Sequence, residues 1–249
     1  STLVSYQTFK GENFHSIGMG AILTLLGVLI TGILLIKKVK GSILLGILIT
    51  WVLGIICELL HIYVPNPDAG MYSVIPTAFV SFDFTAIGKT FGQAFKVDFG
   101  SMKILDFITI MFAFLFVDIF DTLGTLIGVS SKANMLDEEG KLPRIKGALL
   151  ADAVATTVGA ILGTSTTTTY VESASGVTEG GRTGLTAVTT AILFLLALIF
   201  SPLFLTIPSF ATAPALIIVG FFMIGNVVKI NFEDPAEGIP AFLTIAAMP

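Results

Sequence analysis

The stretch Gly163-Thr-Ser-Thr-Thr-Thr-Thr-Tyr-Val-Glu-Ser-Ala-Ser-Gly176 interrupts a chain of 249 residues that is otherwise strongly apolar. Its six consecutive hydroxyl residues, 164–169, include five β-branched threonines, which favour an extended backbone over a helix. The preceding glycine can end a helix, and the Ala/Ser/Gly pattern after Val171 allows a helix to resume, with Glu172 in its first turn. The stretch therefore predicts a helix, a short extended segment and a second helix in direct succession.

The composition predicts a membrane protein. Only 12% of the residues are charged, against about a quarter in soluble domains, and the mean hydropathy is +0.95. The net charge of −4 argues against a nucleic-acid partner, because no basic surface would meet the phosphates. A single cysteine, Cys57, excludes an internal disulfide, and no Cys/His cluster predicts a metal site.

Uncharged runs mark the expected membrane spans, because an ionised side chain at mid-membrane costs about 2.5–3.5 kcal/mol on insertion scales. The expected spans are residues 16–36, 41–57, 107–129 and 147–163, with two more inside the uncharged run 183–228. A last apolar run, 239–249, has 11 residues, whereas a span needs about 20. We therefore expect the chain to be a piece of a longer protein, cut inside a helix.

The orientation follows from the distribution of lysine and arginine in the loops. With Lys37, Lys38 and Lys40 on the cytoplasmic side, nine basic residues lie inside and four outside. That count requires one further crossing within 163–182, where extended backbone is tolerated only if protein or a wet cavity covers it. We therefore expect a discontinuous span there, a short strand followed by a half-helix; the alternative is a continuous helix whose threonines bond back to it.

Four acidic residues fall within the expected spans or beside the break. Asp118 and Asp121 lie three residues apart and so share one helix face, Asp152 lies in the next span, and Glu172 follows the hydroxyl run. Acids inside a membrane are candidate functional residues, because their burial has to be compensated. The alternative for each is a hydrogen-bond network that joins helices. No Ser/His/Asp set and no HExxH motif predicts an enzyme.

The outer segment 61–103 is too long for a simple turn. Phe84, Ile87, Phe91 and Phe95 recur at helical spacing and predict an amphipathic helix. It lies either in the membrane interface or over the protein's own outer face.

Two motifs, Phe120-Asp-Thr-Leu-Gly-Thr125 and Thr166-Thr-Thr-Thr-Tyr-Val-Glu-Ser-Ala-Ser-Gly-Val177 with the following Gly-Gly-Arg-Thr-Gly184, resemble the nucleobase cation symporters (xanthine/uracil permeases). The azaguanine-resistance-type purine permease branch is the most similar, and the resemblance covers nearly the whole chain. It implies an all-α polytopic membrane protein of fourteen spans in two inverted seven-span repeats. This chain would hold spans six to twelve and the start of thirteen.

The resemblance also implies which parts of the chain belong to the gate domain and which to the core domain. Residues 1–60 would be gate-domain spans, 61–103 an extracytoplasmic segment, 104–205 the core domain with the substrate site, and 206–249 a gate-domain span with the truncated start of the next. Substrate binding would fall to Asp121, Thr122, Thr169, Val171, Glu172 and Ser173. Proton coupling or support of the site would fall to Asp118, Asp121, Asp152 and Glu172.

The implied function is import of hypoxanthine or guanine, in some members adenine, across the cell membrane by proton symport. Besides the bilayer, the partner would be the purine base, whose N–H groups Asp121 and Glu172 would accept. No cofactor is expected, Na⁺ stays open as the coupling ion, and a homodimer is the family's expectation. The alternatives are a uracil or xanthine carrier, or an inorganic-anion carrier of the same architecture, which the carboxylate of Glu172 disfavours.

Overall fold

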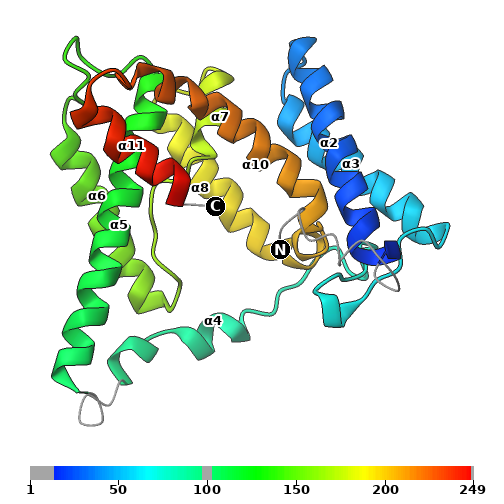
Figure 1. The fold of residues 1–249 in the computed structure, drawn as a ribbon. Coiled ribbons are helices and arrows are strands. Elements are labelled where there is room, and N and C mark those ends of the chain that lie inside the picture. The colour runs from blue at the N-terminus through cyan, green and yellow to red at the C-terminus, as the bar shows by residue number, and fades with distance from the viewer. Residues whose placement is uncertain (1–13, 97–102, 248–249) are drawn as a thin grey trace. The chain divides into compact units, whose positions relative to one another are not determined.

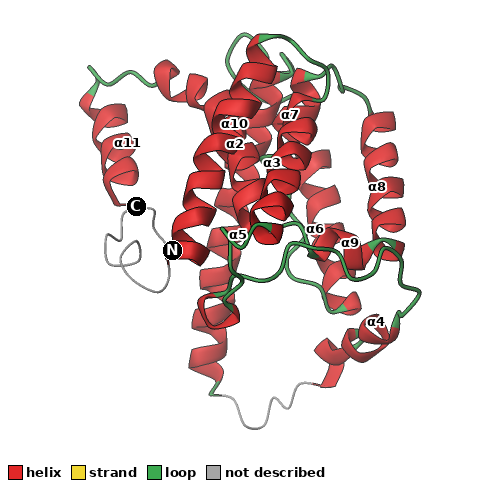
Figure 2. Ribbon diagram, turned by 90° about the vertical axis from the view of Figure 1, so that its right-hand side faces the viewer, coloured by secondary structure: helices red, strands yellow, loops and turns green. Residues whose placement is uncertain are grey.

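The computed structural model describes residues 14–96 and 103–247, and within these ranges all regular elements are helices (Figures 1 and 2). In chain order they are η1 Phe14–Gly18, α2 Met19–Ile36, α3 Ser42–Leu59, η2 Pro67–Ala69, α4 Thr85–Thr90, η3 Gln93–Lys96, α5 Ile104–Lys132, α6 Ile145–Leu162, α7 Ser173–Thr178, α8 Gly184–Ile199, α9 Ser201–Leu205, α10 Ser209–Met223, η5 Ile224–Lys229 and α11 Pro235–Ala247. The predicted all-helical class is confirmed for the described chain.

Several helices are long and apolar enough to cross a membrane. By length and composition these are Phe14–Ile36, Ser42–Leu59 and Ile145–Leu162, at the places where uncharged runs predict spans. The run 183–228 forms two shorter apolar helices, α8 and α10, joined through α9. Helix α5 covers the remaining predicted span, 107–129, and carries both of its aspartates.

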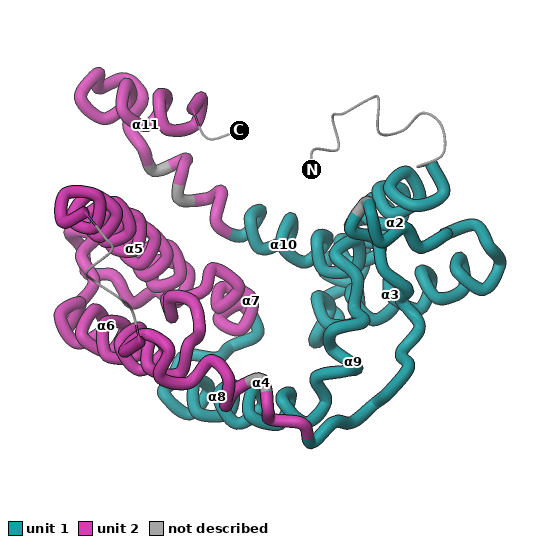
Figure 3. The backbone as a smooth tube through the Cα atoms, turned by 90° about the horizontal axis from the view of Figure 1, so that it is seen from below, with its two compact units in different colours: residues 1–82, 179–222 teal, residues 83–178, 223–249 magenta. Residues whose placement is uncertain are grey.

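The chain divides into two compact units (Figure 3). Unit 1 consists of residues 1–82 and 179–222, and unit 2 of residues 83–178 and 223–249. The four functional domains that the resemblance implies stay predictions.

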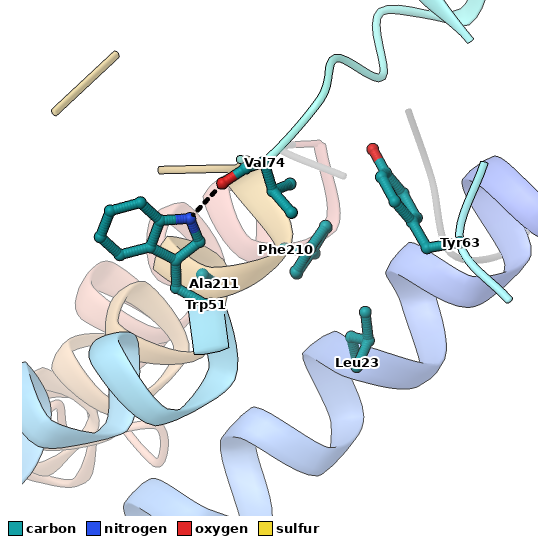
Figure 4. Close-up of a cluster of buried hydrophobic side chains, with 6 residues drawn as sticks. All are labelled: Leu23, Trp51, Tyr63, Val74, Phe210 and Ala211. Carbon is teal, nitrogen blue, oxygen red and sulfur yellow. Dashed lines mark hydrogen bonds between the residues drawn. The ribbon is translucent and has the colours of Figure 1, made fainter. Parts of the chain in front are cut away.

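In unit 1, the outer segment after α3 folds back onto the helices. Its core is formed by Leu23, Trp51, Tyr63, Val74, Phe210 and Ala211 (Figure 4). Trp51 Nε1 donates to the Val74 carbonyl (2.9 Å), and the Glu58 carboxylate accepts the Val74 N–H (2.8 Å). Burial, and secondly the Glu58 charge, raise the pKa of Tyr63 to about 12, so its phenol stays protonated. The phenol can then donate to the Tyr72 carbonyl (3.0 Å).

Glycine and threonine let α2 and α3 approach each other closely. Thr31 and Thr50 are buried, and each hydroxyl donates to a carbonyl in its own helix, that of Gly27 (2.7 Å) and that of Gly46 (2.7 Å). The side chain of Thr31 fills the place that a Cβ on Gly46 would take, and the Thr50 side chain and Pro214 do the same at Gly27. Such small-residue contacts hold membrane helices together by van der Waals packing.

The predicted amphipathic helix of the outer segment forms in two pieces, in unit 2. Gly92, with φ of 70°, ends the helical path between α4 and η3. Its N–H donates to the Ile161 carbonyl (2.8 Å), and Thr90 Oγ1 donates to the Leu162 carbonyl (3.2 Å). These bonds satisfy carbonyls at the end of α6 that lack a partner within the helix. The segment therefore contacts the end of α6, while its apolar side chains Phe84, Ile87, Phe91 and Phe95 stay exposed. Its place in the membrane interface or over the protein's outer face stays a prediction.

Gly46→Ala is expected to destabilise the protein by about 1–3 kcal/mol, because the added methyl group overpacks against Thr31. Gly32→Ala, on α2, is the matched control, since nothing lies within 4 Å of a Cβ at that position. The measurement is the melting temperature of the intact protein in detergent. Equal melting temperatures for the two variants would contradict the close approach of α2 and α3.

Candidate functional site

The predicted interruption of the helix at residue 163 is confirmed, and a continuous helix from 163 to 176 is wrong. Helix α6 ends at Leu162, and Gly163 adopts the left-handed conformation with φ of 80°. The N–H groups of Gly163 and Thr164 donate to the carbonyls of Ala160 (3.2 Å) and Gly159 (2.9 Å), the bonding pattern of a Schellman motif.

The segment after the break differs in detail from the predicted strand and half-helix. Residues 164–170 have no regular secondary structure, because no second extended segment pairs with them in the described chain. Helix α7 follows with only six residues. The Ser173 N–H donates to the Tyr170 carbonyl (3.1 Å), so in this conformation it is not open to a ligand.

The hydroxyl of Thr122, on α5, is the centre of the site. Thr122 is 2% exposed, and its Oγ1 donates to Asp152 Oδ2 on α6 (3.1 Å). The same oxygen lies 2.9 Å from Thr168 Oγ1 in the broken segment. Because a hydroxyl carries one proton, Thr168 is then the donor in the second bond. One buried side chain thus joins two helices to the segment between α6 and α7.

Asp152 is one of three predicted acids that lie near one another on α5 and α6. Asp118 is half-buried and lies within electrostatic reach of the carboxylates of Asp152 and Asp121. Asp121, on the same helix face by its spacing, is exposed. In the described part of the chain, no group of three His, Cys, Asp or Glu side chains is arranged to hold a metal ion.

The remaining predicted residues lie in and after the broken segment. Thr169 and Val171 are half-buried, and Glu172 and Ser173 are exposed. No hydrogen bond between the described residues joins the Glu172 carboxylate to the three aspartates. The structure therefore places these residues in succession along one segment, and it brings Asp118, Asp121, Thr122 and Asp152 together beside it.

Two residues outside the predicted set of site residues also hold the segment. Thr168 bonds to Thr122, and Thr156 Oγ1 donates to the Thr167 carbonyl (2.7 Å). A signal for Thr156 exists in its spacing: it lies four residues after Asp152 and therefore on the same face of α6.

Thr122→Val is expected to destabilise the intact protein by about 1–3 kcal/mol, because Asp152 and Thr168 lose a hydrogen-bond partner at a buried site. Thr109→Val on the same helix should change stability by no more than about 0.5 kcal/mol, since its exposed hydroxyl only bonds back to Leu105. Melting temperatures in detergent check the difference. A Thr122→Val protein as stable as Thr109→Val would show that the network carries no stability.

Comparison with known proteins connects this architecture to transport. The family model described as "Permease family" (Xan_ur_permease) matches residues 4–249. The chain is 41% identical over 244 residues to the guanine/hypoxanthine permease PbuO and 43% identical over 237 residues to the guanine/hypoxanthine permease PbuG, both of Bacillus subtilis strain 168. It is 38% identical over 230 residues to the adenine permease AdeQ of Escherichia coli strain K12.

These alignments cover 95%, 95% and 92% of this chain, and 51%, 50% and 48% of the respective relatives. The chain thus spans about half the length of the curated relatives that it matches. Apolar helices and the family match together define a membrane protein of the permease class. The chain belongs to the xanthine/uracil permease family.

Proposed function

We propose that the protein to which this chain belongs imports purine nucleobases, guanine and hypoxanthine first, through the cell membrane by proton symport. The observation that carries the proposal is the broken segment, with Glu172 at its end and a group of three aspartates linked through Thr122 to Thr168. The names of the relatives support the choice of substrate, since two are guanine/hypoxanthine permeases and one is an adenine permease.

The substrate contacts follow from which polar groups are available. Purines present N–H donors along one edge, and a carboxylate accepts such donors strongly because it is charged. Asp121 and Glu172 are exposed, and neither carboxylate has a hydrogen-bond partner among the described residues. Thr122 is buried and engaged with Asp152 and Thr168, so we assign it to positioning rather than to substrate contact.

Proton coupling rests on the three neighbouring aspartates. Carboxylates within electrostatic reach of one another repel when all are ionised, and a proton taken up by one relieves that repulsion. A proton bound at Asp118 or Asp121 would also reduce the charge that a moving core domain carries through the membrane. Na⁺ could neutralise the same group, which makes the coupling ion a separate question for experiment.

The proposal includes the architecture of two inverted seven-span repeats. A chain that covers about half of its relatives agrees with about seven of fourteen spans. That these are spans six to twelve with the start of thirteen follows from the family resemblance. The rest of the protein would complete the pocket around Asp121 and Glu172. An inorganic-anion carrier is disfavoured, because these two exposed carboxylates would repel its substrate.

Asp121→Asn and Glu172→Gln should each reduce uptake of radiolabelled hypoxanthine by the intact protein to background, because an amide is a weaker acceptor for purine N–H groups. Asp106→Asn is the matched control: Asp106 is exposed in the first turn of α5, far along the helix from the network, and its loss should leave uptake normal. Surface expression is measured for all three. Normal uptake by both site variants would refute the assignment.

A protonophore should abolish concentrative hypoxanthine uptake by the intact protein, whereas replacing Na⁺ by choline should leave it unchanged. The reason is that the aspartate group takes up a proton from the outer side in the proposed cycle. If uptake falls when Na⁺ is removed and persists with the protonophore, the coupling ion is Na⁺ and not the proton. The proposed import of nucleobases would still hold.

A further inference from the structure

We propose that Thr156 and Gly159, on α6, are positioning residues of the nucleobase site, and that they act by holding the backbone of residues 164–168. Neither would touch the substrate. The inference rests on the proposed function, because the segment that they hold leads to Glu172.

Thr156 uses its hydroxyl differently from its neighbour. Thr157 Oγ1 donates to the Ala153 carbonyl four residues back in the same helix (2.8 Å), as is usual for a helical threonine. Thr156 Oγ1 instead donates to the Thr167 carbonyl (2.7 Å), outside the helix. The Thr167 carbonyl lies outside any helix or sheet, and the Thr156 hydroxyl gives it the hydrogen-bond donor that regular secondary structure would otherwise provide.

Gly159 allows the segment to lie directly on α6. A Cβ at this position would stand 2.8 Å from both Thr164 Oγ1 and Thr167 Oγ1, closer than side chains tolerate. The Gly159 carbonyl also accepts the Thr164 N–H (2.9 Å). Gly147, near the other end of the same helix, has nothing within 4 Å of a Cβ.

Together with Asp152, these residues form one face of α6 at positions i, i+4 and i+7. Asp152 reaches the segment through Thr122, Thr156 reaches it directly, and Gly159 makes room for it. Residues 164–170 form neither a helix nor a strand, so the path of their backbone depends on these contacts. Glu172 follows Thr167 by five residues, and a shift of the Thr167 carbonyl therefore moves the carboxylate that would meet the base.

The test compares Thr156→Val, Thr156→Ser and Thr157→Val in the intact transporter, with hypoxanthine, guanine and adenine as substrates. Thr156→Val should raise the KM for hypoxanthine about threefold to tenfold, the loss of one hydrogen bond, with a smaller change in maximal rate per molecule at the surface. Thr156→Ser keeps the hydroxyl and should restore the KM to within about twofold. Thr157→Val should match the wild type, and the ratio of KM values between the three purines should change only in Thr156→Val.

Gly159→Ala and Gly147→Ala give a second, independent comparison, which also serves if Thr156→Val does not reach the membrane. Gly159→Ala should raise the KM, and Gly147→Ala should not. A wild-type protein that carries no nucleobase would overturn the proposed function. Wild-type transport with equal KM values in Thr156→Val and Thr157→Val, or in the two glycine variants, would overturn the positioning role and leave the function intact.

Discussion

A backbone that leaves the helix inside an apolar layer must find hydrogen-bond partners elsewhere in the protein, because lipid offers none. In this chain α6 ends at Gly163, and the segment that follows has no regular secondary structure. The expected position of this break within a span would create that demand. The hydroxyl of Thr156 meets part of it at the Thr167 carbonyl, and the Thr122 hydroxyl holds the Thr168 side chain. Side chains on α5 and α6 thus supply the hydrogen bonds that the segment after the break does not make within itself.

The polar groups of the site fall into two sets: those bonded to one another, and those whose carboxylates have no hydrogen-bond partner in the described chain. Thr122 and Asp152 bind each other, and both are therefore engaged before any ligand arrives. Asp121 and Glu172 keep exposed carboxylates. A buried network whose members are all satisfied stiffens its surroundings, whereas an unengaged carboxylate is free to accept a donor from a substrate or to take up a proton. The family assignment gives this separation its proposed meaning in nucleobase transport.

In unit 1, threonine and glycine have a different role, which is close packing between two helices. Thr31 and Thr50 each donate to a carbonyl of their own helix, so the glycine on the facing helix comes close and that contact is made by packing alone. In unit 2, Thr156 sends its hydroxyl out of the helix. Whether a helical threonine serves packing or holds another segment therefore depends on what lies opposite, and the residue type does not reveal it.

The sequence by itself determined the membrane class, the positions of the long apolar helices, the interruption after Gly163 and the acids near it, because hydropathy, charge and β-branching act over a few neighbouring residues. Only the tertiary structure decided that Thr122 binds Asp152 and Thr168, which lie 30 and 46 residues away. It also decided that the hydroxyl run forms no strand and that the outer amphipathic segment divides at Gly92. Each of these outcomes depends on which segment, distant in the sequence, lies close enough to supply a hydrogen-bond partner. A local sequence pattern does not encode which distant segment that is.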